Sequence, residues 1–398
     1  MDVTNNILQQ NRMDIIISNI EPQIWNSVAS EKRIGVLDGL SGIALFYHYL
    51  IQIEPSEEYQ NKLFSIIDQI SDLISEEVYN SSLCSGMAGY GWVLSKIKNQ
   101  NIEIEDEYFE ALDDILEEAL REESEKNYYD FLHGALGIAL YFIERYRDKK
   151  EEKIKRILLE FSNTLTDKIN QNPESVFLSN SENPNQKCIY FGLAHGLSGT
   201  LNFLIFLQKN LYHENQNTDS AIIKTIDFMN LYKIYDEESK QFYPSQVLIN
   251  DSNIVKARLG WCQGDLGIVN AIFNSGIFLN DEKLKKDADI LLKTTTKINV
   301  EESLVNDFAL CHGSSGIILQ YYMTAKKTNL SLSFPETTSI WFENLKKQTK
   351  NHTEFKSFFI DKYINETNIL NGSAGLALTF LTVENQISYD WTECLNLY

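Results

Sequence analysis

Two cysteines and a histidine recur in a pattern that suits a metal ion. Cys262 lies two residues before a Gly-x-x-Gly step that begins at Gly264, and Cys311 lies two residues before the step that begins at Gly313. His312 directly follows the second cysteine. Thiolate and imidazole ligands together are typical of zinc, and three protein ligands leave one position open, as in catalytic sites. We therefore predict a zinc (Zn2+) site formed by Cys262, Cys311 and His312.

Plain burial is the alternative for any single cysteine, because free cysteine is among the most buried residue types. The chain has five cysteines, and an odd, widely spread set does not indicate a disulfide framework. Cys84, Cys188 and Cys394 are interpreted as core residues. Cys84 shares the repeat position of Cys262 and Cys311, but no histidine follows it.

The Gly-x-x-Gly step that begins at Gly196 carries a candidate acid or base. His195 stands one residue before this step, in the unit that neighbours Cys262, where it could deprotonate a nucleophile or protonate a product. Asp130, four residues before the step of the preceding unit, could orient His195. Arg258, four residues before Cys262, could hold that carboxylate or stabilise an oxyanion. His133 shares the repeat position of His195 and is assigned a structural role.

Two kinds of chemistry remain open for such a site. A substrate thiol that entered the open metal position would lose its proton, because coordination stabilises the thiolate. A water molecule in the same position would make the protein a hydrolase.

A repeat along the whole chain positions these residues. Seven Gly-x-x-Gly steps use 14 of the 19 glycines, and a dense apolar run follows each step. Glycine at these points allows close backbone approach and unusual dihedral angles. Charged, amphipathic segments lie between the runs, so the pattern predicts buried inner helices that alternate with outer helices. The steps begin at Gly39, Gly86, Gly134, Gly196, Gly264, Gly313 and Gly372.

Seven such helix pairs predict an all-α protein in which one domain, residues 1–398, forms a closed ring. If the ring closes, all inner helices run the same way, and the residues before each step converge on one mouth. Two intervals, near 170–194 and 235–259, lack helical periodicity. They are predicted to be insertions with loops and short strands that could cover this mouth.

Composition excludes several classes of protein. The formal net charge of −21 argues against a nucleic-acid partner, which normally requires a basic face. No stretch has the roughly 18 uninterrupted apolar residues of a membrane span, so we expect no direct membrane insertion. The first residues show neither the basic region nor the apolar core of a signal peptide, and we expect a soluble, cytoplasmic protein.

At these residues the sequence resembles the lanthionine synthetase C family, the zinc cyclases of lantibiotic biosynthesis. The resemblance rests on the segments Gly-Leu-Ala-His-Gly at 192–196, Gly-Trp-Cys-Gln-Gly at 260–264 and Cys-His-Gly at 311–313. The seven steps extend it over essentially the whole chain.

The resemblance implies an α/α toroid and an intramolecular Michael addition. In that reaction a cysteine thiolate of a dehydrated precursor peptide attacks dehydroalanine or dehydrobutyrine and forms a (methyl)lanthionine thioether ring, after which the enolate is protonated. This is a lyase-class carbon–sulfur bond formation. The residues that the resemblance assigns are the zinc ligands Cys262, Cys311 and His312, the acid/base His195, and the supporting Asp130 and Arg258.

The resemblance also bears on partners. It implies a complex with a lantibiotic dehydratase and a membrane ABC transporter, which would make the protein peripheral to the membrane through its partners. One departure from the family is Gln263, where some members carry a tyrosine. Its amide can form hydrogen bonds but cannot act as an acid.

Two alternatives remain open. The first is another toroid enzyme that activates thiols with zinc, such as a prenyltransferase subunit. The zinc set of that family includes a carboxylate, and no aspartate here follows the paired-cysteine pattern. The second is a non-catalytic zinc-binding relative that binds a peptide or glutathione.

Overall fold

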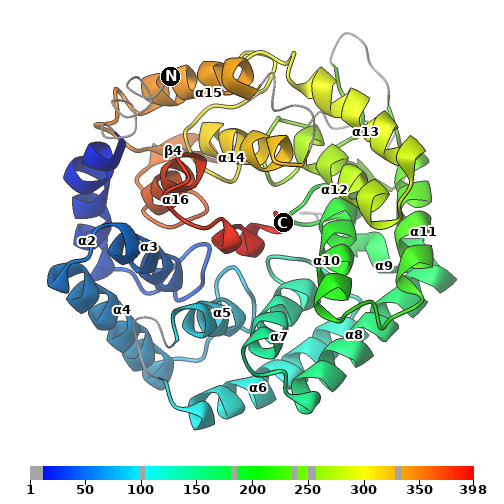
Figure 1. Cartoon of the computed structure of the whole chain (residues 1–398), viewed down its shortest axis with the longest axis horizontal. Coiled ribbons are helices and arrows are strands. Elements are labelled where there is room, and N and C mark those ends of the chain that lie inside the picture. The colour runs from blue at the N-terminus through cyan, green and yellow to red at the C-terminus, as the bar shows by residue number, and fades with distance from the viewer. Residues whose placement is uncertain (1–11, 99–103, 181–185, 235–239, 250–256, 328–333) are drawn as a thin grey trace.

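The computed structural model describes residues 12–98, 104–180, 186–234, 240–249, 257–327 and 334–398. Within these ranges an inner layer of helices lies inside an outer layer, and the two layers form a ring (Figure 1). The inner helices are α3 (Leu40–Ile53), α5 (Met87–Ile97), α7 (Ala135–Lys149), α10 (Leu197–Asn210), α12 (Asp265–Phe278), α14 (Ser314–Ala325) and α16 (Ser373–Val383). The outer helices are α2 (Glu21–Val28), α4 (Glu57–Glu76), α6 (Asp106–Glu125), α8 (Glu152–Gln171), α11 (Thr218–Asn230), α13 (Glu282–Thr295) and α15 (Phe334–Gln348).

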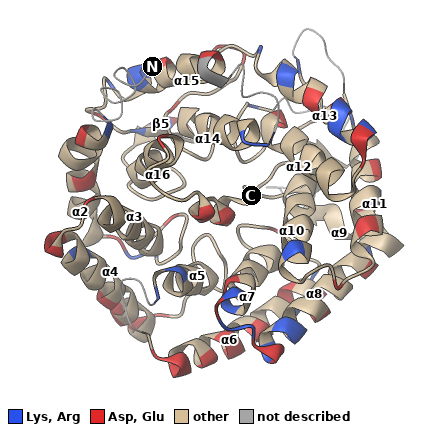
Figure 2. Ribbon diagram, in the orientation of Figure 1, with Lys and Arg blue, Asp and Glu red and all other residues tan. Residues whose placement is uncertain are grey.

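This arrangement confirms the predicted α/α toroid. The inner helices are buried almost all round, as their apolar sequences require, and the outer helices bury one face each. In α8 the buried face includes Ile154, Ile157, Leu158 and Phe161, which follow helical spacing. Charged side chains lie mainly on the outer helices, with acidic residues prominent along α4 and α6 (Figure 2). No helix in the described part of the chain is long and apolar enough to span a membrane.

Each inner helix begins directly after the first glycine of its step. The glycine backbones there are extended, as at Gly39 (φ −140°) and Gly313 (φ −111°), and none of the 19 glycines has a positive φ. The expectation of unusual dihedral angles is therefore wrong, and close approach explains the glycines instead. A Cβ on Gly35 would overlap the carbonyl oxygen of Cys84, and one on Gly192 would overlap that of Cys262.

Each Gly-x-x-Gly step with its inner and outer helix is one unit, and the units are numbered one to seven in chain order. Backbone hydrogen bonds join the turns of neighbouring units into a ring. In six of seven neighbouring pairs, the residue two before one step donates its N–H to the carbonyl of the equivalent residue in the next unit, at 2.8 to 3.3 Å. The bond from Leu370 to Leu37 closes the ring between units seven and one. The other five bonds run from Leu37 to Cys84, Cys84 to Leu132, Ala194 to Cys262, Cys262 to Cys311, and Cys311 to Leu370.

One link of this ring is interrupted. No backbone bond from Leu132 to Ala194 occurs among the described residues, and the N–H of Leu132 donates instead to Asp130 Oδ1 at 2.8 Å. The interruption falls between units three and four, which carry His133 and His195. The ring thus brings the predicted site residues to one mouth. Among the described residues, its one missing backbone hydrogen bond lies next to two histidines.

The two predicted insertions pair with each other. Strands β1 (Leu178–Asn180), β2 (Lys187–Tyr190) and β3 (Gln246–Leu248) form an antiparallel sheet in that order, after the short helix α9 (Pro173–Phe177). The second insertion is also fixed to α12, because the N–H groups of Phe242 and Tyr243 donate to Asp265 at 2.9 and 3.0 Å. Residues 235–239 and 250–256 of this insertion lie outside the described residues.

Three further features were not expected from the sequence. The C-terminal 3-10 helix η3 (Asp390–Leu395) lies inside the ring (Figure 1), where the carbonyl of Leu395 accepts a hydrogen bond from Trp261 Nε1 at 2.8 Å. A hairpin of β4 (Ser357–Phe359) and β5 (Lys362–Ile364) precedes α16. At the N-terminal side, a short π-helix, η1 (Ile16–Ile20), leads into α2.

Candidate functional site

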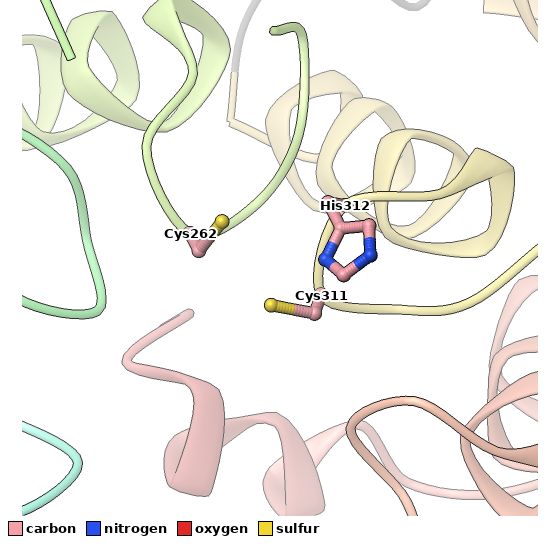
Figure 3. Close-up of side chains that lie close together, drawn as sticks. All are labelled: Cys262, Cys311 and His312. Carbon is pink, nitrogen blue, oxygen red and sulfur yellow. The ribbon is translucent and has the colours of Figure 1, made fainter. Parts of the chain in front are cut away.

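The three predicted zinc ligands lie close together at the mouth. Cys262 comes from the turn before α12, and Cys311 and His312 come from the turn before α14. Their potential ligand atoms all lie within 4.8 Å of one another, and the side chains face a common space (Figure 3). This is the one such group of three or more histidine, cysteine or acidic residues within the described ranges.

The donor set fits a metal ion such as zinc. A hydrogen bond from Cys311, together with the charges of His312, His195 and Arg258, lowers the pKa of Cys262 to about 6 against the effect of burial. The hydrogen bond and burial raise the pKa of Cys311 well above its usual value. Without a cation the pair favours one thiolate and one thiol, so a cation between the sulfurs would stabilise the second thiolate.

The hairpin and a buried aspartate orient His312. Its Nε2 lies 3.2 Å from the carbonyl oxygen of Phe358 in β4 and 3.5 Å from Asp307 Oδ2. These contacts leave Nδ1 as the ring nitrogen for a metal, in the way that outer groups fix the tautomer of metal-ligating histidines. Asp307 is itself fixed, because it accepts hydrogen bonds from the N–H groups of Phe358 (2.6 Å) and Ala309 (2.9 Å).

Asp307 was not identified from the sequence. It lies six residues before Gly313, and Arg258 lies six residues before Gly264. Asp307 and Arg258 therefore occupy the same repeat position. This shared position was the signal in the sequence that could have identified Asp307 as a polar residue facing the site.

We expect Asp307→Asn to lower the affinity for zinc by about 10- to 100-fold, because outer groups of this kind typically contribute that much. Competition with a chromophoric chelator would measure the change. The matched control is Asp361→Asn, an exposed aspartate in the turn between β4 and β5, which should leave the affinity unchanged. Equal affinities of the two variants would show that Asp307 does not support the ligand.

Asp130 holds His195 across the interrupted link. Nδ1 of His195 lies 2.7 Å from Asp130 Oδ2, while Asp130 Oδ1 accepts hydrogen bonds from the N–H groups of Leu132 and His133, both at 2.8 Å. Burial lowers the pKa of His195, but the hydrogen bond and charge of Asp130, with a contribution from Cys262, raise it above the usual value. His195 therefore takes up a proton readily while its Nε2 remains for a substrate.

A cavity of about 680 Å³ lies beside this pair. His195, His133, Asp130 and Gln263 all line it. The small sheet forms part of the same wall, so the two insertions border the mouth next to His195. The sheet and its flanks contribute Leu178, Ser179, Lys187, Tyr190, Ser245 and Gln246.

In the described part of the chain, Arg258 does not form the ion pair with Asp130 that was one of its two expected roles. Within the described residues the ion pair of Asp130 is with His195, and no ion pair joins Arg258 to Asp130. Hydrogen bonds from the backbone of its own turn and from His195 already satisfy this carboxylate, so it needs no arginine. The charge of Arg258 instead acts on Cys262, whose pKa it lowers.

The three remaining cysteines, Cys84, Cys188 and Cys394, are free and buried, which confirms that they belong to the core.

Comparisons with known proteins agree with this architecture. The sequence model of the family described as "Lanthionine synthetase C-like protein" matches residues 30–396, so the chain belongs to the lanthionine synthetase C-like family. Among solved structures, nisin cyclase matches with a TM-score of 0.75 and 21% sequence identity, over 95% of this chain and 97% of that one. At this identity the match shows a shared fold. A sequence comparison with curated proteins found no match.

Proposed function

We propose that the protein is a zinc-dependent lanthipeptide cyclase that forms (methyl)lanthionine rings in a dehydrated precursor peptide. The observation that carries this proposal is the convergence of Cys262, Cys311 and His312 near a histidine–aspartate pair on a cavity. Membership of the lanthionine synthetase C-like family and the fold shared with nisin cyclase support it.

The proposed reaction joins two parts of one peptide. The S–H bond of a peptide cysteine is lost, a C–S bond forms at the β-carbon of dehydroalanine or dehydrobutyrine, and a proton is added to the α-carbon. Zinc held by Cys262, Cys311 and His312 would supply the thiolate, because a metal ion lowers the pKa of a thiol that it binds.

The protein's own side chains handle the remaining charge and protons. Protonated His195 donates its Nε2 proton to the enolate carbon, while Asp130 holds Nδ1 and stabilises the imidazolium. Arg258 is proposed to stabilise the negative charge that develops on the enolate oxygen. Gln263, at the position of a tyrosine in some relatives, contributes a hydrogen bond from the cavity wall but no acidic proton.

We also propose the setting in which this chemistry takes place. Residues 1–398 form one cyclase domain, and the insertions near 170–194 and 235–259 border its mouth. The protein works in the cytoplasm on the precursor peptide and reaches the membrane through a complex with a dehydratase and an ABC transporter. The family resemblance supports this setting.

The test is incubation with a dehydrated precursor peptide, followed by thiol alkylation and mass spectrometry. Cyclisation changes no mass, so the expected result is a loss of alkylatable cysteines that depends on the protein. Unchanged alkylation, together with binding of the peptide or glutathione, would instead favour a non-catalytic relative. Turnover of a prenyl diphosphate would favour the prenyltransferase-like alternative.

A further inference from the structure

A second imidazole lies beside the proposed acid. The rings of His133 and His195 have centroids 6.0 Å apart and planes that differ by 16°, which is within the range of offset stacking. They come from the turns before α7 and α10 and occupy the same position in neighbouring repeats. The proposed reaction uses His195 and gives His133 no role.

One carboxylate fixes both turns. Asp130 Oδ1 accepts the N–H of His133 at 2.8 Å, and Asp130 Oδ2 contacts His195 Nδ1 at 2.7 Å. Any movement of the His133 turn therefore shifts the group that holds His195. This arrangement stands in place of the backbone bond that the other six unit pairs make among the described residues, so Asp130 links the two turns here.

The hydrogen bond to Asp130 does not fully determine the orientation of His195. The bond to Nδ1 restrains both side-chain torsions of His195, but a single hydrogen bond tolerates a range of lengths and angles, so the ring can still tilt. The side chain of His195 is 31% exposed, so the protein does not enclose it completely. Two rings lie next to it, the nearly parallel His133 and Tyr190, which has its centroid 6.3 Å away at an angle of 58°.

We propose that His133 is a positioning residue, which holds the imidazole of His195 in one orientation while Asp130 holds its Nδ1. This inference rests on the proposed role of His195 as the acid. The parallel ring limits the tilting of the His195 ring, so Nε2 stays directed toward the reacting carbon. Holding reacting groups in place to within about 1 Å is worth up to about 100-fold in rate.

The charge states of the two rings are compatible with this role. Burial lowers the pKa of His133, Asp130 opposes that effect, and the charge of His195 lowers the pKa again. The pKa of His133 is thus shifted down and that of His195 up, so His195 takes up a proton at a higher pH than His133, and over that range like charges do not repel across the stack.

A measurement without peptide tests the positioning directly. The protein is labelled with ¹³C at histidine Cε1, and ring order parameters are compared in the wild type, His133→Ala and His133→Phe. Phenylalanine keeps a flat ring but cannot titrate. We expect the order parameter of the His195 ring to be the same in the wild type and in His133→Phe, and to fall to the range of flexible groups, below about 0.6, in His133→Ala. An unchanged value in His133→Ala would overturn the proposal.

Kinetics with a dehydrated precursor peptide provide the second readout. His133→Ala should lower kcat about 10-fold with KM within about twofold, and His133→Phe should restore kcat to within about threefold. Ser85→Ala, at the same repeat position in unit two, is the matched control. If His133→Phe is as slow as His133→Ala, the imidazole itself handles protons and positioning is wrong. If the wild type cyclises no peptide, the proposed function fails, while the order parameters still decide the role of His133.

Discussion

Cys262→Ala and Cys311→Ala are each expected to lose the bound metal and cyclisation together. The wild type should carry about one zinc ion per chain, and each variant should purify with almost none. Each substitution leaves two of the three proposed ligands and removes a thiolate from a pair that one cation would stabilise. The cyclisation rate should fall by about 10³-fold or more, since a metal ion contributes several kcal/mol to the stabilisation of charge.

Cys84 offers a matched control for these variants. It occupies the same repeat position and belongs to the same ring of backbone hydrogen bonds, but it lies in unit two and is buried in the core. Cys84→Ala keeps those backbone bonds and should keep its zinc. Elemental analysis of the four proteins is the measurement. Undiminished zinc in both Cys262→Ala and Cys311→Ala would show that the metal centre is assigned to the wrong residues.

The second large effect is expected at His195. His195→Ala should lower kcat by about 10²- to 10⁴-fold, the usual contribution of a positioned acid or base. Its zinc content should stay at the wild-type level, because the imidazole is not among the three clustered ligands. Steady-state kinetics combined with metal analysis would separate the two roles. Full cyclisation activity in His195→Ala would show that His195 is not the acid or base and only contacts a bound thiol or peptide.

The pH profile should identify Asp130 as the partner of His195. The protonated imidazole donates the proton, so the rate of the wild type should fall as the pH rises through the raised pKa of His195. Asp130→Asn removes the charge that raises this pKa and keeps an oxygen for the N–H groups of Leu132 and His133. The fall in rate should therefore move to lower pH. A profile at the wild-type position would rule out this pairing.

The ring and the convergence of the ligands could be predicted from the sequence because the repeat is regular. Each Gly-x-x-Gly step starts an inner helix, so residues just before the steps must meet once the ring closes. Cys262, Cys311 and His312 follow directly from that rule, and so do His195 and Asp130. The physical basis is local, since these positions depend on helix starts and on the close packing of glycine turns.

The residues outside the repeat could not be predicted in the same way. The contact between Asp307 and Phe358 joins positions 51 residues apart through a three-residue strand, which has too little periodicity to be recognised. The C-terminal helix η3 lies inside the ring because Trp261 and other inner groups bind it, and no local pattern indicates this. The missing bond at Leu132 likewise depends on how units three and four meet in space.

Zinc-dependent thioether formation is tested most directly by one metal-exchange experiment. A dehydrated precursor peptide is incubated with the protein as purified, with the protein after treatment with a chelator, and with the treated protein after zinc is added back. Alkylation and mass spectrometry then count the free peptide thiols. If zinc is required, thiols are lost rapidly with the first and third samples, and their loss with the second does not exceed the uncatalysed background. Equal loss of thiols with the metal-free protein would contradict this requirement.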